Sequence, residues 1–130
     1  MGNKASSAVL ATIVALGAAP VLAQDNEIDV PEVAEACVSC HTFAPGEPAL
    51  EGPTLWGVVG RPIASVQGFD YSAALRKLDG DWTPERLDRF LTSPQSYAPG
   101  TLMTLGGVKD ASDRKRVIAF LESLRPVPAQ

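Results

Sequence analysis

The sequence predicts a small all-α domain, on three observations. Its 130 residues leave room for one domain only. The segment Thr83–Glu85 reads Thr-Pro-Glu, a strong helix start in which Thr caps, Pro suits the first helical position and the acid suits the first turn. Near the C-terminus, apolar residues recur at the i, i+3, i+4, i+7 spacing of one helical face, namely Val117, Phe120, Leu121 and Leu124.

The N-terminal half of the domain predicts one helix, a long loop and a short helix. Pro31 suits the first turn of the first helix, whose face continues through Val33, Cys37 and Cys40. The Gly- and Pro-rich stretch 45–62 predicts a loop. A short helix is expected over 72–77.

The C-terminal half predicts two further helices separated by a loop. The first begins at Thr83, ends at Pro94 and buries Leu87, Phe90 and Leu91. The stretch 93–103 is punctuated by Pro and Gly and predicts a loop. Ser112 opens the last helix, Pro126 stops it, and the charge run 113–116 is expected to be a solvated first turn. We expect the first and last helices to cross and pack.

The segment Met1–Ala23 predicts an export signal. Lys4 precedes the apolar run 8–19, and Val-Leu-Ala at 21–23 matches a cleavage site. A retained membrane anchor is the alternative, but the run is shorter than the roughly 20 residues that a spanning helix needs, and Pro20 interrupts its end. We therefore expect a signal peptide at 1–23, a domain at 24–130 without a membrane span, and a periplasmic location.

Composition excludes several classes of protein. The net charge of −4 leaves no basic footprint for nucleic acid, and loss of Lys4 would make the chain still more acidic. Two cysteines cannot form a disulfide-dense scaffold. Because only 6% of the residues are aromatic, a purely protein core would be thin, and small domains of this kind often recruit a metal or cofactor.

The segment Cys37–His41 carries the strongest functional signal. It reads Cys-Val-Ser-Cys-His, and C-x-x-C-H is the attachment motif of c-type haem. On a helix, Cys37, Cys40 and His41 share one face, so two thioethers could hold a porphyrin edge while the imidazole reaches the iron. A redox-active C-x-x-C pair and a structural disulfide are the alternatives.

Met103 is the candidate for the second axial ligand of the iron. It is the only methionine beyond the predicted signal, and it ends the turn-rich stretch 93–103. A lone methionine more often fills a gap in a core. Its place in a loop, away from any helical apolar stripe, favours the ligand interpretation here, and His/Met ligation suits an electron carrier.

Three segments together resemble the class I cytochromes c, close to the bacterial cytochromes c2 and the mitochondrial type. They are Cys37–His41, Gly52–Gly57 and Pro99–Met103. The resemblance covers nearly the whole of 24–130. It implies a small cytochrome c fold, in which helices and loops wrap around one haem c attached through Cys37 and Cys40, with His41 and Met103 as iron ligands.

The resemblance also implies roles for five further residues. The carbonyl of Pro53 would accept a hydrogen bond from the His41 imidazole and orient it. Thr101 would steady the region of the haem propionates. Three residues fall where the family places donors to the buried propionate, namely Arg61, Tyr71 and Trp82.

The chain departs from the family pattern near the methionine ligand. Phe90 replaces a tyrosine that many relatives have beside the sulfur, so it cannot donate a hydrogen bond there. Leu105 faces the haem edge, where an aromatic residue is often found. Uncharged residues replace the lysines that basic relatives carry around the loop, namely Gln95, Ser96 and Leu102.

The expected function is that of a monomeric, non-enzymatic monohaem carrier of single electrons. The donor would be a dehydrogenase or reductase and the acceptor an oxidase or similar protein, met through an apolar patch around Leu102 and Leu105. Three alternatives stay open: a cytochrome subunit bound tightly to an oxidoreductase, a ligand-binding haem protein with a labile Met103, and a thiol–disulfide protein without haem.

Overall fold

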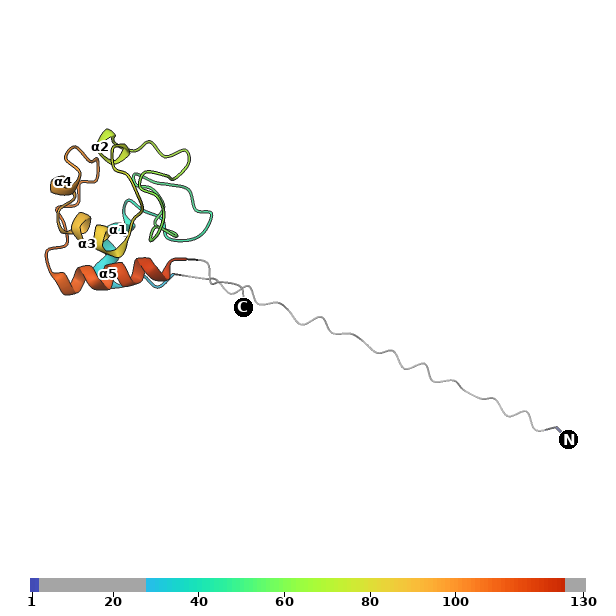
Figure 1. Cartoon of the computed structure of the whole chain (residues 1–130). Helices are drawn as coiled ribbons and strands as arrows, with labels where there is room; N and C mark the ends of the chain where they lie inside the picture. The colour runs from blue at the N-terminus through green and yellow to red at the C-terminus, as the bar shows by residue number, and fades with distance from the viewer. Residues whose placement is uncertain (3–27, 126–130) are drawn as a thin grey trace.

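The computed structural model describes residues 1–2 and 28–125 (Figure 1). The predicted cleavage after Ala23 and the predicted start of the domain at Gln24 lie outside these residues and stay predictions. The chain from 28 to 125 has short helices joined by long loops, with no strand and one isolated bridge between Pro62 and Asp81. The expected all-α class is confirmed. The elements in order are η1 (Glu32–Ala34), α1 (Glu35–Val38), α2 (Ala73–Arg76), α3 (Pro84–Thr92), α4 (Pro94–Tyr97) and α5 (Ala111–Ser123).

The first helix is shorter than expected. Pro31 lies before the 3-10 turn η1 rather than inside a first helical turn, and α1 ends at Val38. Cys40 and His41 therefore follow the helix in a turn, where both N–H groups still bond to the Cys37 carbonyl at 3.2 and 2.9 Å. The carbonyl of Cys40 accepts from a distant loop N–H, that of Gly52 at 2.8 Å, and so does not continue the helix.

Helices α2 and α3 confirm their start signals. Ser72 accepts from the N–H of Leu75, so α2 fills the interior of the expected 72–77 segment. Thr83 accepts from the N–H of Arg86 at 3.2 Å, and α3 buries the expected residues Leu87, Phe90 and Leu91. The stretch 93–103 was predicted to be a loop throughout, but Pro94 starts the one-turn helix α4. A proline that ends one helix can also occupy the first turn of the next.

Helix α5 begins at Ala111, one residue before the expected Ser112. The carboxylate of Asp110 accepts a hydrogen bond from the N–H of Asp113 at 2.9 Å and so caps the helix. Asp is as good an N-cap as Ser, and the two residues Asp110 and Ser112 lie only two positions apart. The helix ends at Ser123, and Pro126 lies outside the described residues.

The buried face of α5 differs slightly from the predicted one. Val117, Leu121 and Leu124 are buried as expected, but Ile118 is buried where Phe120 was expected. Phe120 is half-buried and packs against Phe43, with ring centroids 5.6 Å apart.

Helix α5 runs along the base of the domain beside the N-terminal turn (Figure 1). It packs against η1, where Ala34 and Val117 are each 1% exposed. The predicted packing of the first and last helices is confirmed.

Arg114 corrects the prediction that the charge run at 113–116 is merely solvated. Its side chain is only 11% exposed, and its Nε donates to Asp88 Oδ1 of α3 at 2.8 Å. Its Nη1 also donates to the carbonyls of Val108 and Lys109. Arg114 thus ties α5 to α3 and to the preceding loop, a long-range role that local charge patterning cannot reveal.

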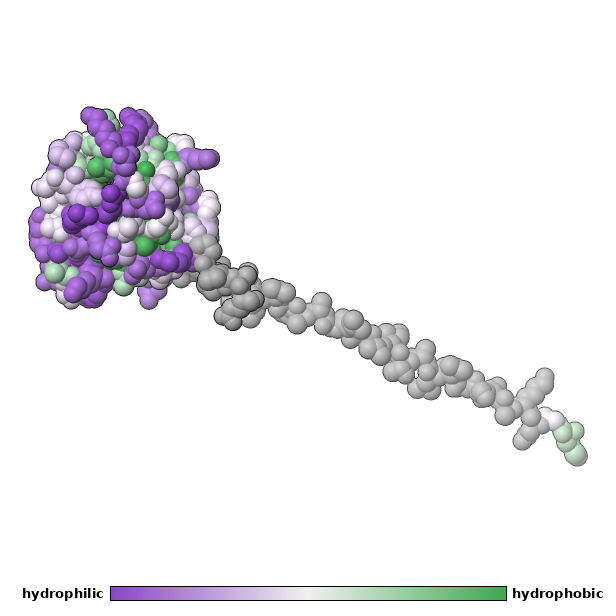
Figure 2. Space-filling model, viewed as in Figure 1, coloured by the Kyte–Doolittle hydropathy of each residue, from purple (hydrophilic) through white to green (hydrophobic). Residues whose placement is uncertain are grey.

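Polar side chains cover much of the surface, with a few small hydrophobic patches on the face seen in Figure 2. In the part of the chain that the structure describes, no helix combines the length and apolarity needed to cross a membrane. The larger exposed hydrophobic residues of the domain are Val38, Leu50 and Leu102.

Candidate cofactor-binding site

A cavity of about 460 Å³ lies inside the domain. Protein interiors are normally close-packed, and cofactor sites occupy roughly 300–1,000 Å³. Part of the cavity wall consists of residues that also form the hydrophobic core, namely Val58, Leu87, Phe90, Val117 and Leu121. The core of this domain is therefore built around a site for a large apolar group.

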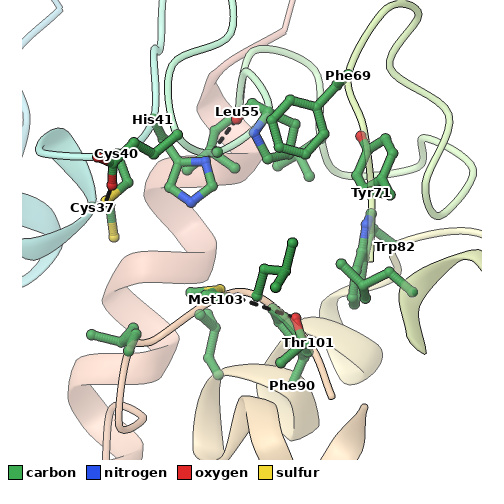
Figure 3. A pocket seen from close by; sticks show the side chains of 18 of the residues that line it. Cys37, Cys40, His41, Leu55, Phe69, Tyr71, Trp82, Phe90, Thr101 and Met103 are labelled. Carbon is green, nitrogen blue, oxygen red and sulfur yellow. Dashed lines mark hydrogen bonds between the residues drawn. The ribbon is translucent and has the colours of Figure 1, made fainter. Parts of the chain in front are cut away.

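Cys37 and Cys40 lie at one edge of this cavity (Figure 3). Both are free thiols, so the structural disulfide considered above is absent. Burial raises the pKa of the Cys37 thiol, and the neighbouring Cys40 adds to the shift. The strand–turn–helix context of a thioredoxin-type motif is also missing from residues 28–125. The arrangement suits two covalent attachments to one edge of a bound group.

The His41 imidazole projects into the cavity from one side (Figure 3). Its Nδ1 lies 2.7 Å from the carbonyl oxygen of Pro53, so the expected hydrogen bond is present. Since a carbonyl only accepts, the proton is on Nδ1 and the lone pair of Nε2 is available to a metal. Burial lowers the pKa of His41, while the Pro53 hydrogen bond opposes that shift.

Gly52 lies directly against the same imidazole. A Cβ at this position would lie 2.6 Å from His41 Nδ1 and 2.8 Å from Nε2, closer than real Cβ atoms approach. Only glycine leaves room for the ring in this orientation. Gly52 lies in the segment Gly52–Gly57 that resembles the family, but nothing in the sequence indicates that a side chain at this position would collide with His41.

Met103 lies on the opposite side of the cavity from His41 (Figure 3). Its N–H donates to the hydroxyl of buried Thr101 at 3.4 Å. The structure thus brings together, around one cavity, the two side chains that the sequence singled out as axial ligands.

Arg61 supplies an independent test of whether a haem fits. Its Nη1 and Nη2 donate to the carbonyls of Trp56 and Thr54 at 3.0 and 2.8 Å, which fixes the guanidinium. Its Nε is buried and has no partner among the described residues. A buried N–H without an acceptor costs about 1–3 kcal/mol, and a haem propionate would supply the acceptor. Burial lowers the pKa of Arg61.

Tyr71 and Trp82 lie at the end of the cavity away from the cysteines (Figure 3). The Tyr71 hydroxyl accepts from the N–H of Val66 at 3.2 Å and keeps its own proton to donate. The indole N–H of Trp82 is a further donor, and Trp82 lines the same end of the cavity. Together with Arg61 they leave three donors along the cavity wall, which fits a carboxylate in this region.

Phe90 belongs to an aromatic cluster in the cavity wall. Its ring centroid lies 5.0 Å from that of Trp82 and 5.8 Å from that of Tyr97. Near the mouth, Leu105 is half-buried and Leu102 is 75% exposed. Within the described part of the chain, the charged residues that line the cavity are Glu51, Arg61 and Asp70, and no lysine lines it.

Comparison with known proteins gives consistent matches, although no family model matches the chain. It is 48% identical over 90 residues to the "cytochrome c-type cyt cy" of Rhodobacter capsulatus, a match covering 69% of this chain and 44% of that protein. It is 45% identical over 92 residues to a cytochrome c homolog of Rickettsia prowazekii, covering 71% and 53%. The chain therefore spans about half the length of these relatives.

Two further matches cover most of the other protein. Cytochrome c of Stellaria longipes is 41% identical over 86 residues, which is 66% of this chain and 80% of that protein. Among solved structures, cytochrome cH from Methylobacterium extorquens matches with a TM-score of 0.66 and 34% identity, over 70% of this chain and 91% of that one.

Proposed function

Because this chain belongs to the class I cytochrome c family, we propose that it is an exported carrier that moves single electrons between redox proteins. The family implies one covalently bound haem c, and the cysteine pair at Cys37 and Cys40 has the required spacing. The observation that carries the proposal is the set of His41, Met103 and both cysteines around one cavity.

Covalent attachment is the first role of this chain's residues. Cys37 and Cys40 form the two thioether bonds, which keep the group in place in both oxidation states. His41 would bind the iron through Nε2. Its orientation is set by the hydrogen bond from Nδ1 to the Pro53 carbonyl oxygen, 2.7 Å away, and by Gly52, which leaves room for the ring.

Met103 would supply the second ligand of the iron, from the side of the cavity opposite His41. When bound, the haem supplies an iron that alternates between the ferrous and ferric states. A soft thioether favours ferrous iron and raises the reduction potential. With His41 and Met103 both bound to the iron, no coordination position would be left for substrate, so the protein would act as a carrier rather than an enzyme.

The donors at the far end of the cavity hold the buried propionate. Arg61 Nε, the Tyr71 hydroxyl and the Trp82 indole would donate to the carboxylate, and Thr101 would steady the adjoining loop. An ionised acceptor makes these hydrogen bonds shorter and stronger than neutral ones. They offset the cost of burying the negative charge and limit its rearrangement during electron transfer.

Redox partners dock at the mouth of the cavity through Leu102 and Leu105. Leu102 is 75% exposed, and the charged lining residues near the mouth are acidic. A net charge of −4 disfavours a strongly acidic partner. The partner surface is therefore apolar and neutral or weakly basic, and the contact is small, as in other transient electron-transfer encounters.

Export to the periplasm rests on the signal expected at 1–23. Covalent attachment of haem to a C-x-x-C-H motif in an exported chain agrees with that location. Removal of Met1–Ala23 would leave the carrier as a protein of 107 residues, counted from Gln24 to Gln130.

The test is the mass and redox behaviour of the protein purified from a host that matures c-type cytochromes. We expect one porphyrin retained after denaturation, a mass consistent with cleavage after Ala23, and a reversible one-electron titration. The variant Cys37→Ala with Cys40→Ala should lose covalent retention. Unmodified mass for the wild-type chain would contradict the proposal, and rapid carbon monoxide binding to the native ferrous protein would contradict the carrier role.

A further inference from the structure

The segment that carries Met103 has few backbone restraints of its own. Between residues 28 and 125, no backbone–backbone hydrogen bond involves positions 102–107. The segment is anchored at its ends, where Thr101 N–H bonds to the Ala98 carbonyl at 2.9 Å and Val108 N–H bonds to the Leu91 carbonyl at 2.8 Å. The position of Met103 therefore depends on side chains that reach its peptide groups.

Gln95 is the side chain that bridges this segment. Its Nε2 donates to the carbonyl of Thr101 at 2.8 Å and to the carbonyl of Met103 at 3.4 Å. Its Oε1 accepts from the N–H of Gly100 at 3.4 Å. One amide group thus bonds to three peptide groups across four residues that end at Met103.

The base of this side chain is fixed. Gln95 lies in α4, directly after Pro94, which is among the most completely buried side chains of the domain. Among residues 28–125, the only other polar side chain that bonds to the Met103 peptide groups is Thr101, through the Met103 N–H at 3.4 Å. The two side chains thus hold opposite ends of the same residue, Thr101 at its N–H and Gln95 at its carbonyl.

We propose that Gln95 is a positioning residue for the methionine ligand: its amide keeps the 100–103 segment closed and so sets how often Met103 leaves the iron. The inference rests on the proposed ligation by Met103. An amide is suited to this role because it both donates and accepts, whereas a charged side chain could do only one of the two.

The test is the rate at which imidazole binds to the ferric protein at saturating concentration, where opening of the segment limits the reaction. Gln95→Glu keeps the acceptor and removes both donated bonds, and Gln95→Met removes all three bonds at similar size. Since the two or three lost hydrogen bonds together change an equilibrium by about fivefold or more, we expect both variants to bind imidazole at least fivefold faster. Gln67→Met is the matched control, because Gln67 is an exposed glutamine in another loop.

The outcomes separate this inference from the proposed function. The wild-type ferric protein must first show the thioether-to-iron charge-transfer band, and its absence would overturn the ligation itself. If the band is present but both Gln95 variants bind imidazole at the wild-type rate, the role of Gln95 is wrong while ligation stands. An equal acceleration in Gln67→Met would likewise overturn it, since the effect would then not come from the bridge to Met103.

Discussion

At the scale of single residues, the site depends on atoms that are absent as much as on atoms that are present. Gly52 faces the imidazole of His41 at a distance where any Cβ would collide with it. The ring lies close to that glycine and hydrogen-bonds to the Pro53 carbonyl, so the orientation of His41 is set by its neighbours before any iron binds. The same principle of fixing a ligand through its surroundings applies to Met103, held by Thr101 and Gln95.

Gly52→Ala should therefore damage the site directly. The added methyl forces the His41 ring to move or the backbone to shift, which costs about 1–3 kcal/mol in a well-packed interior. We expect a loss of that size in the free energy of unfolding of the haem-loaded protein, measured by denaturant titration. Gly106→Ala is the control, because no atom lies within 4 Å of a Cβ at that position. Equal stability of the two variants would show that the contact with His41 carries no strain.

The variant Phe90→Tyr tests how the cavity wall affects the midpoint potential of the iron. Phe90→Tyr adds a hydroxyl on the wall that it shares with Met103. A hydrogen bond to the thioether weakens its donation to ferric iron and should raise the midpoint potential. A net hydrogen bond of about 1 kcal/mol corresponds to roughly 40 mV for a one-electron couple, which is the expected upper limit. A potentiometric titration that shows no change beyond error would refute this role.

At the scale of elements, the two longest helices, α3 and α5, each start at a short capping residue. Asp110 caps α5 and Thr83 caps α3, each through a bond to the N–H three residues on. Both helices contribute to the cavity wall, so these caps also stabilise the site. Thr83 was predicted as the cap of α3, whereas Ser112 was expected to open α5. The apolar spacing of the helix does not show that Asp110 has extended backbone and bonds to the Asp113 N–H.

The variants Asp110→Ala and Ser112→Ala test which of the two residues caps α5. Loss of a true N-cap costs about 1 kcal/mol, and a substitution at an exposed helical serine costs much less. We expect Asp110→Ala to lower the free energy of unfolding by that amount and Ser112→Ala to leave it nearly unchanged. The reverse order in denaturant titrations would restore Ser112 as the start of the helix.

The sequence predicts helices well where the signal is local, and poorly where distant segments decide. Leu87, Phe90 and Leu91 were predicted on the buried face of α3 because their spacing alone shows it. The early end of α1 at Val38 depends on a hydrogen bond from Gly52, and the burial of Arg114 depends on Asp88 of another helix. Neither could be inferred from neighbouring residues.

At the scale of the whole molecule, one cavity gathers residues that are spread from position 36 to position 121. The motif Cys37–His41 and the lone Met103 predicted this site because their chemistry is specific, and the resemblance implied Pro53, Arg61, Tyr71, Trp82 and Thr101. The hydrogen bonds of Gln95 could not be predicted, because nothing in the residues next to a surface glutamine shows which distant peptide groups it contacts. Its role depends on how the loop folds back over α4.

Docking is tested by the salt dependence of electron transfer to membranes from the source organism. Because the mouth is mainly apolar, raising the ionic strength from about 0.01 to 0.1 M should change the rate only slightly. Leu102→Asp should lower the rate by about tenfold, as for loss of a central apolar contact. Leu50→Asp is the control, since Leu50 is 52% exposed but does not line the cavity. A steep fall in rate with salt would contradict apolar docking.

The most direct measurement is the absorption spectrum of the oxidised, purified protein, compared with that of Met103→Leu. Leucine keeps the apolar volume of the side chain and removes only the sulfur. We predict a thioether-to-iron charge-transfer band in the wild-type spectrum and its complete loss in the variant, with the porphyrin still covalently attached in both. A wild-type protein without that band, or a band that survives in Met103→Leu, would contradict the assignment of His41 and Met103 as the two ligands of one electron-carrying iron.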